Sequence, residues 1–292
     1  MSHYAVLVIG DYPESQLEPF DENLECEAYY VGDVSEADKE QMLRYYNRNE
    51  VVYNTFEEGY REKGGEWNGK AWRLEDGVWR EYSTYNPDSK WDWYQLGGRW
   101  TGAFIKLKDG AQGTLGTRSW ASDRNTAGVD QAYKKDIDFD AIKRDARNEA
   151  IKTYRECAEK CGGCIPHLPL LWKDIMNSKE YGNLDIGEKR ELYHSQEAVK
   201  IWTEKVNEGN PWGYCIEDFQ CTEEEYATRA ELNSFIPYAV LYEGEWISRG
   251  DMGWWGITTN EHFDQNDWRK MVWELIDSVD DDTLFSFYDL HI

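Results

Sequence analysis

The chain has 292 residues, more than one typical domain, and 40% of them are hydrophobic, including 15 Trp, 20 Tyr and 9 Phe. This apolar content can offset the chain entropy lost on folding, which excludes global disorder. The length predicts two compact parts or one part with a large insertion. The net charge of −25, from 32 basic and 57 acidic residues, opposes contact with phosphates and argues against a direct DNA or RNA binder.

The acidic charge lies at the two ends of the sequence. Residues 1–60 hold 14 acidic and 3 basic residues, and residues 201–292 hold 20 acidic and 5 basic ones. Such a field suits a basic partner, such as the DNA-facing surface of a nuclease, or serves solubility alone. We expect a cytoplasmic protein with reduced cysteines, because no charged apolar leader opens the chain and no apolar run approaches the roughly 20 residues of a membrane span.

The first third of the chain begins with a strand. Residues 4–9 form a β-branched run that ends at Gly10, which indicates a buried strand. An irregular acidic loop is expected next, and then a helix over 36–48 with Ser35 as its N-cap and Asp38 completing a capping box.

The middle of the chain combines hairpins with helices. Aromatic residues alternate with polar ones from Trp67 to Tyr85, and turns at 68–69 and 76–77 predict two successive hairpins. Another strand, turn and strand are expected over 91–107, with the turn at Gly97-Gly98, before a loop over 109–128 that is rich in glycine and serine. Helical spacing then predicts helices over 139–161, 188–207 and 222–232.

The C-terminal part predicts strands over 236–242 and 245–249, a helix over 267–279 and a last strand over 283–290. The fold class is therefore α+β, with a mixed or antiparallel sheet formed by both chain ends. We expect residues 1–60 and 235–292 to form one acidic domain, and residues 61–234 to be an insertion that carries the Trp-rich hairpin and the long helices.

One cluster has the spacing of soft metal ligands. It consists of Cys157, Cys161, Cys164 and His167, with Gly162-Gly163 available for a turn. Cys157 and Cys161 also suit one helix face, as small buried hydrophobic residues, with Cys164 and His167 in an ordinary helix exit, and the sequence leaves zinc binding open. We therefore assign no metal and no cofactor.

Catalytic signatures are absent from the sequence. The five histidines are scattered, and the glycine-rich segments lack the spacing of a phosphate-binding loop. The carboxylates are so numerous that any pair of them could be chosen arbitrarily as catalytic. We expect a protein that is not an enzyme, with no catalytic residue.

The Trp-rich segment, residues 90–100 with the sequence KWDWYQLGGRW, is the candidate contact surface. Alternation places Trp91 and Trp93 on one strand face, and Arg99 stacks between aromatic rings or pairs with Asp92. A structural hairpin locked by aromatic pairs is the alternative. The candidate partner-binding residues are Trp91, Trp93, Tyr94, Arg99 and Trp100.

The Trp-rich segment, the MGWWG of residues 252–256, the opening MSHYAVLVIG and the closing DLHI resemble a widespread family of phage-encoded proteins. The resemblance covers nearly the whole chain. The chain is also similar in size and acidity to the Gabija anti-defence proteins, phage inhibitors that assemble around the host Gabija nuclease complex and stop it from engaging DNA. No catalytic residue and no contact residue carries over from that similarity.

The resemblance implies a phage immune-evasion protein that acts in the host cytoplasm, forms a homo-oligomer and binds the Gabija nuclease complex. One alternative is an enzyme or a sponge that holds a nucleotide or modified base between the Trp-rich hairpin and the glycine-rich loop. Such a protein needs one concave pocket, whereas an inhibitor needs a broad interface of more than roughly 1,000 Å². A structural phage protein stabilised by metal is the third possibility.

Overall fold

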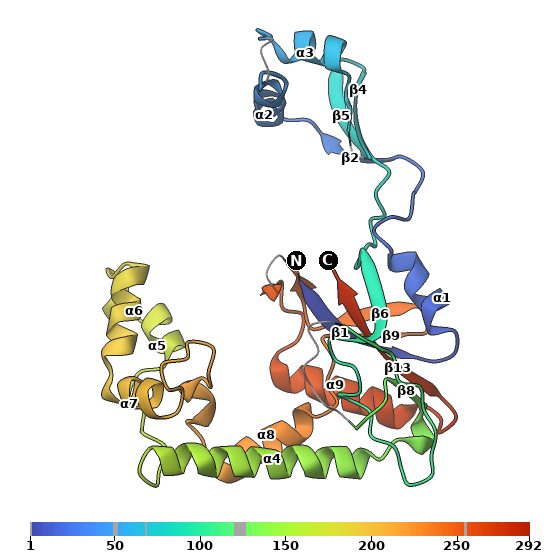
Figure 1. Ribbon diagram of the computed structural model, residues 1–292. Coiled ribbons are helices and arrows are strands. Elements are labelled where there is room, and N and C mark those ends of the chain that lie inside the picture. The colour runs from blue at the N-terminus through green and yellow to red at the C-terminus, as the bar shows by residue number, and fades with distance from the viewer. Residues whose placement is uncertain (1, 49–51, 68, 120–126, 254–255) are drawn as a thin grey trace.

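The computed structural model describes residues 2–48, 52–67, 69–119, 127–253 and 256–292. Figure 1 shows three parts: a core that contains both chain termini, a small lobe above it and a helical lobe to one side. The described residues between 29 and 83 form the small lobe, and residues 161–221 form the helical lobe. The fold is α+β, as the sequence predicts.

The main sheet lies in the core and joins the two ends of the chain. Its strands are β1 (His3–Ile9), β6 (Trp93–Gly98), β7 (Thr117–Arg118), β8 (Gln131–Tyr133), β9 (Ala239–Tyr242), β10 (Glu245–Ser248) and β13 (Leu284–His291). The order is β10-β9-β1-β13-β6-β7, and β8 also pairs with β13. The first and last strands are antiparallel, with His3 opposite His291 and Ile9 opposite Phe285. Because β1 pairs with β9 in parallel, the sheet is mixed.

Apolar side chains cover both faces of the main sheet. On one face, α9 (Gln265–Ser278) and the start of α4 (Phe139–Lys160) pack with Leu7, Ile9 and Phe287. On the other face, α1 (Pro13–Leu17) and the short helix η1 (Glu18–Phe20) pack with Val6 and Val8. Alternate residues of β1 thus enter opposite cores, which explains why this strand is a continuous apolar run.

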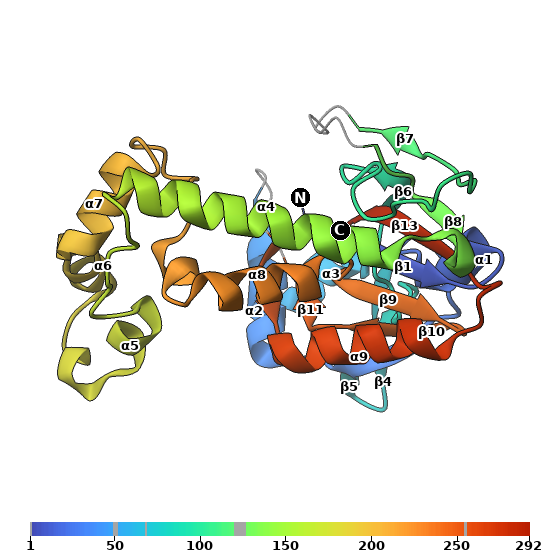
Figure 2. The same ribbon diagram turned by 90° about the horizontal axis from the view of Figure 1, so that it is seen from below.

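The helix α4 leads from the core to the helical lobe, and α8 (Glu223–Asn233) returns beside it (Figure 2). Arg147 pairs with Glu224 at 2.5 Å and Arg155 with Glu223 at 2.7 Å, so the two helices are joined by charge as well as by packing.

The helical lobe contains α5 (Trp172–Asn177), η3 (Lys179–Tyr181), α6 (Ile186–Ser195), α7 (Glu197–Lys205) and η4 (Ile216–Phe219). The single helix expected over 188–207 is wrong, because the chain is extended at Gln196 between α6 and α7. The Gln196 amide accepts a hydrogen bond from the Leu170 N–H at 2.9 Å and donates one to its carbonyl at 3.0 Å. These contacts with a distant loop stabilise the break.

The small lobe contains β2 (Tyr29–Asp33), β3 (Glu66–Trp67), β4 (Lys70–Glu75) and β5 (Val78–Ser83), with α2 (Glu36–Tyr46) and α3 (Phe56–Lys63). Its strand order, β2-β5-β4-β3, contains the two successive hairpins predicted from the sequence. Asp76 and Gly77 have φ of 51° and 79°, as a tight turn requires, while Asn68 of the other turn lies outside the described residues. Ser35 and Asp38 form the predicted capping box of α2.

Several sequence expectations differ from the structure. The range 61–234, expected to be an insertion, supplies β6, β7 and β8 to the main sheet, while the small lobe straddles residue 61. The hairpin expected over 91–107 is not formed, because β6 pairs with the distant β13 and a turn follows Gly98. The expected acidic loop contains α1 and η1, since a proline at the start of each suits a first helical turn.

The remaining short elements are β11 (Asp251–Met252), β12 (Thr258–Thr259) and η2 (Lys134–Asp136). In the described part of the chain, no helix combines the length and the apolar character that crossing a membrane requires.

Candidate functional site

The Trp-rich segment ends in two glycines that lie against buried carboxylates. Gly97 and Gly98 have φ of 77° and 53°. A Cβ atom on Gly97 would lie 2.5 Å from an oxygen of Asp130, and one on Gly98 would lie 2.4 Å from the Cβ of Asp289. Both the backbone conformation and the space therefore require glycine here.

Asp289 joins three segments that are far apart in the sequence. Its side chain is fully buried. One oxygen accepts a hydrogen bond from the Arg99 backbone N–H at 2.9 Å, and the other lies 2.7 Å from the His3 Nδ1. The first strand, the last strand and the turn after β6 thus meet at one carboxylate.

Asp130 stabilises the loop that follows Gly98. Its two oxygens accept hydrogen bonds from the N–H groups of Gly102 at 2.6 Å and Gly116 at 2.8 Å. Burial raises the pKa of Asp130, although these two donors act in the opposite direction. The Thr101 hydroxyl adds a bond to the Gly98 carbonyl at 2.6 Å. The loop is therefore bound to the core through backbone groups.

A second histidine–aspartate pair lies beside the first. The Nδ1 of His291 is 2.5 Å from Asp92, and the rings of His3 and His291 meet edge to face with centroids 4.9 Å apart. The rings of Trp93 and His3 also meet edge to face, with centroids 5.9 Å apart. Two histidines that are separated by nearly the whole sequence thus adjoin Trp93 at one end of the sheet, where β1 and β6 begin and β13 ends.

Gly253 and Gly256, two glycines of the MGWWG motif, lie at the same end of the sheet. The Ser2 hydroxyl donates to the Gly253 carbonyl at 3.0 Å and accepts from the Gly256 N–H at 2.7 Å. Trp254 and Trp255, the aromatic centre of this motif, lie outside the described residues. Described residues from the opening segment, the Trp-rich segment, the segment 252–256 and the closing segment thus lie together, although they are spread over the whole chain.

The five predicted contact residues do not form one surface. Trp91 is only 5% exposed, and its indole N–H donates to the Leu17 carbonyl at 3.2 Å. Tyr94 packs edge to face against Trp91, with centroids 4.9 Å apart. Trp93 is 41% exposed, and Arg99 and Trp100 are partly exposed.

Two details expected for the Trp-rich segment are wrong. Trp91 and Trp93 do not share a strand face, because β6 begins only at Trp93 and Trp91 packs in the core on the α1 side. Asp92, expected as a partner of Arg99, pairs instead with His291. The alternative ligand site was expected between a hairpin of this segment and the glycine-rich loop, and that hairpin is not formed. Residues 120–126 of the loop lie outside the described residues.

An acidic strip adjoins this region. We define it as residues 11–28, which contain seven carboxylates and no lysine or arginine. None of the seven forms a salt bridge with a described residue, and all but the half-buried Asp21 are exposed. Burial, together with Glu14, Glu18 and Asp21, raises the pKa of Tyr94. The negative charges of the strip therefore act on Tyr94 of the Trp-rich segment.

Apolar side chains lie within the strip and just beyond it. Tyr12 is 79% exposed, and Leu24, Tyr30 and Val31 are about half exposed. The strip also runs along the connection to the small lobe, where the Glu22 N–H donates to the Trp91 carbonyl at 2.8 Å. Figure 1 shows this connection holding the small lobe away from the core.

The cysteine cluster lies where α4 enters the helical lobe. Cys157 is buried in the apolar core of that lobe, and Cys164 is exposed. Among the described residues, no three His, Cys, Asp or Glu side chains are grouped as a metal ion would require.

His3, Asp130, Asp289 and His291 are site residues that the sequence analysis missed. A signal existed for Asp289, because it is an acidic residue inside an otherwise apolar and aromatic strand. Such a residue is buried only when hydrogen-bond donors surround it. Its partners, however, follow only from the strand pairing.

In comparisons with protein families, with curated proteins and with solved structures, no match was found. The structure itself defines an α+β protein with a mixed sheet.

Proposed function

We propose that this chain is a phage immune-evasion protein that binds the host Gabija nuclease complex and blocks its access to DNA. It acts by stoichiometric binding in the host cytoplasm, as an assembly of several copies, and catalyses no reaction. The acidic strip is the observation that carries this proposal, and the Gabija complex is named on the resemblance described above.

The strip has the chemistry that a DNA-binding surface attracts. A nuclease contacts phosphates through lysine and arginine, and exposed carboxylates that form no salt bridge of their own compete for those cations. Because the carboxylates are exposed rather than buried, they speed encounter with the partner at modest desolvation cost. Tyr12 and Leu24 add apolar area between them, which interface centres require.

The shape of the molecule suits an extended contact. The small lobe stands away from the core, and the strip runs along the connection between them (Figure 1). Further contact residues are Trp93, Arg99 and Trp100, which are at least partly exposed, whereas Trp91 is buried in the core. A surface of this length can exceed the roughly 1,000 Å² that a specific interface buries.

A charge-matched pair of variants tests the proposal. In the strip variant, Glu18, Glu22, Glu25 and Glu27 are each changed to Gln. In the control variant, four exposed glutamates of the helical lobe receive the same change: Glu180, Glu191, Glu197 and Glu204. Both variants lose the same number of negative charges, so solubility and the general electrostatic repulsion between molecules change equally.

The measurement is a pull-down of the Gabija complex with tagged full-length chain, followed by size exclusion with mass determination. We expect wild type and control to form a stable complex and the strip variant to lose it. Equal binding by strip and control variants would show that the strip has no specific role. If wild type forms no complex, the Gabija partner is wrong.

A further inference from the structure

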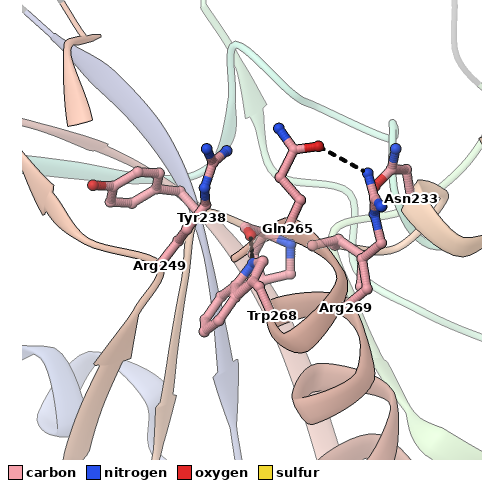
Figure 3. Close-up of a pocket in the computed structure, with 8 residues that line it drawn as sticks. Asn233, Tyr238, Arg249, Gln265, Trp268 and Arg269 are labelled. Atoms are coloured by element: carbon pink, nitrogen blue, oxygen red, sulfur yellow. Dashed lines mark hydrogen bonds between the residues drawn. The ribbon is translucent and has the colours of Figure 1, made fainter. Parts of the chain in front are cut away.

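A pocket of about 320 Å³ lies where the start of α9 meets residues 233–238 and the end of β10. Arg249 and Arg269 line it together with Asn233, Tyr238 and Gln265. Figure 3 shows the side chains of Arg249, Gln265 and Arg269 rising to one side of Trp268. Two arginines in one hollow are notable in a chain with a net charge of −25.

Arg269 is buried, and no carboxylate of the described residues lies within salt-bridge distance of its guanidinium. Arg269 is 9% exposed. Its nitrogens donate to three neutral amide oxygens: Asn233 Oδ1 at 2.5 Å, Asn266 Oδ1 at 2.9 Å and Gln265 Oε1 at 3.3 Å. Burial, followed by the charges of Arg229 and Arg249, lowers its pKa, although the Asp264 carboxylate acts in the opposite direction. A buried cation whose hydrogen-bond acceptors are all neutral is costly unless an anion completes the site.

Arg249 supplies a second group that lacks a partner. Its Nη2 donates to Glu261 at 2.9 Å, but its Nε–H is buried and has no hydrogen-bond partner among the described residues. Each guanidinium carries five N–H donors. Arg269 uses three of them and Arg249 one, so both retain donors for a ligand.

The N-terminus of α9 does not account for the site. Asp264 caps the helix and accepts from the N–H groups of Asn266 at 2.7 Å and Asp267 at 2.9 Å. The attraction for an anion therefore comes from the two arginines.

We propose that this pocket binds a phosphorylated small molecule, with its phosphoryl group between Arg249 and Arg269. Guanidinium groups bind phosphate oxygens in bidentate geometry, and a phosphoryl group provides enough acceptors for both. The volume lies within the range of small-ligand pockets and exceeds the need of a single carboxylate from a partner protein. This site is independent of the acidic strip and of the proposed inhibition.

The test measures thermal unfolding of the full-length chain with inorganic phosphate or adenosine monophosphate, at constant ionic strength against chloride. The variants are Arg269→Met and Arg249→Met, and Arg44→Met is the control because Arg44 is highly exposed. We expect both ligands to raise the Tm of wild type and of the control. Loss of one charged partner weakens binding at least about tenfold, so the rise should disappear in both pocket variants.

Arg269→Met should also raise the Tm in chloride alone, because it removes a buried charge that lacks a counter-ion. Arg249 is partly exposed, so its variant keeps the test valid if Arg269→Met folds poorly. No ligand-dependent rise in wild type would overturn the proposal. An equal rise in wild type and Arg249→Met would place any binding elsewhere and overturn it as well.

Discussion

The Nδ1 of His3 lies 2.7 Å from the Oδ1 of Asp289, and this contact joins the first strand of the chain to the last. The Asp289 side chain is fully buried and that of His3 is 16% exposed. The neighbouring pair of His291 and Asp92 has similar geometry, but the Asp92 carboxylate is substantially exposed. The two pairs allow a buried and an exposed contact of the same chemistry to be compared.

A double-mutant cycle with His3→Ala and Asp289→Ala should give a coupling energy of about 1–3 kcal/mol in urea unfolding, because the contact is desolvated. The matching cycle with His291→Ala and Asp92→Ala should give less than about 1 kcal/mol, because water screens that pair. Coupling near zero in the first cycle would show that the buried contact does not stabilise the sheet.

Replacement of Gly98 tests the fit between the Trp-rich segment and Asp289. Gly98→Ala should lower the free energy of unfolding by more than about 2 kcal/mol, because it adds a steric clash to an unfavourable φ. Gly110→Ala is the control, since Gly110 has φ of 80° with open space around it. Strain alone should cost about 1 kcal/mol there. Equal losses in urea unfolding would mean that the clash is relieved without cost.

The capping box of α2 should depend on pH. The Ser35 hydroxyl and N–H both bind the Asp38 carboxylate and lower its pKa. A carboxylate whose pKa is lower in the folded state stabilises that state above the ordinary aspartate pKa, and this stabilisation is lost as pH falls through the lowered value.

Ser35→Ala should therefore cost about 1 kcal/mol at neutral pH and less near pH 2, as read from hydrogen exchange of α2 amides. In an Asp38→Asn background, the cost of Ser35→Ala should not change between the two pH values. A cost that varies with pH in that background would point to another group.

Alkylation should distinguish Cys157 from Cys164. Burial raises the pKa of Cys157 and reduces its thiolate, whereas Cys164 is exposed. Mass spectrometry after iodoacetamide treatment should find Cys164 modified first and Cys157 only when the lobe opens. A zinc ion held by Cys157, Cys161, Cys164 and His167 would give the opposite result, with Cys164 protected until a chelator is added.

Local sequence patterns predicted most of the helices and strands. The α4 face repeats at helical spacing, and the helix ends just before Gly162 and Gly163, whose φ values of 93° and 110° favour glycine. The hairpins of the small lobe likewise follow from turn residues whose conformational preferences are local. Such elements need no knowledge of the rest of the chain.

Long-range partners could not be predicted in the same way. The aromatic alternation around Trp93 suits either a local hairpin or a strand that pairs with a distant one, and β13 is almost 190 residues away. The break at Gln196 depends on a loop near Leu170. The burial of Asp130 and Asp289 depends on which backbone amides the fold brings to them.

The most direct measurement for the proposed function is a titration of Gabija DNA cleavage with the purified full-length chain. We expect cleavage to fall linearly and to stop at a fixed molar ratio that does not change with incubation time, because each complex is occupied by bound chain. Undiminished cleavage at a large molar excess would contradict the proposed partner. Inhibition by substoichiometric chain that increases with time would contradict binding as the mechanism and indicate catalysis.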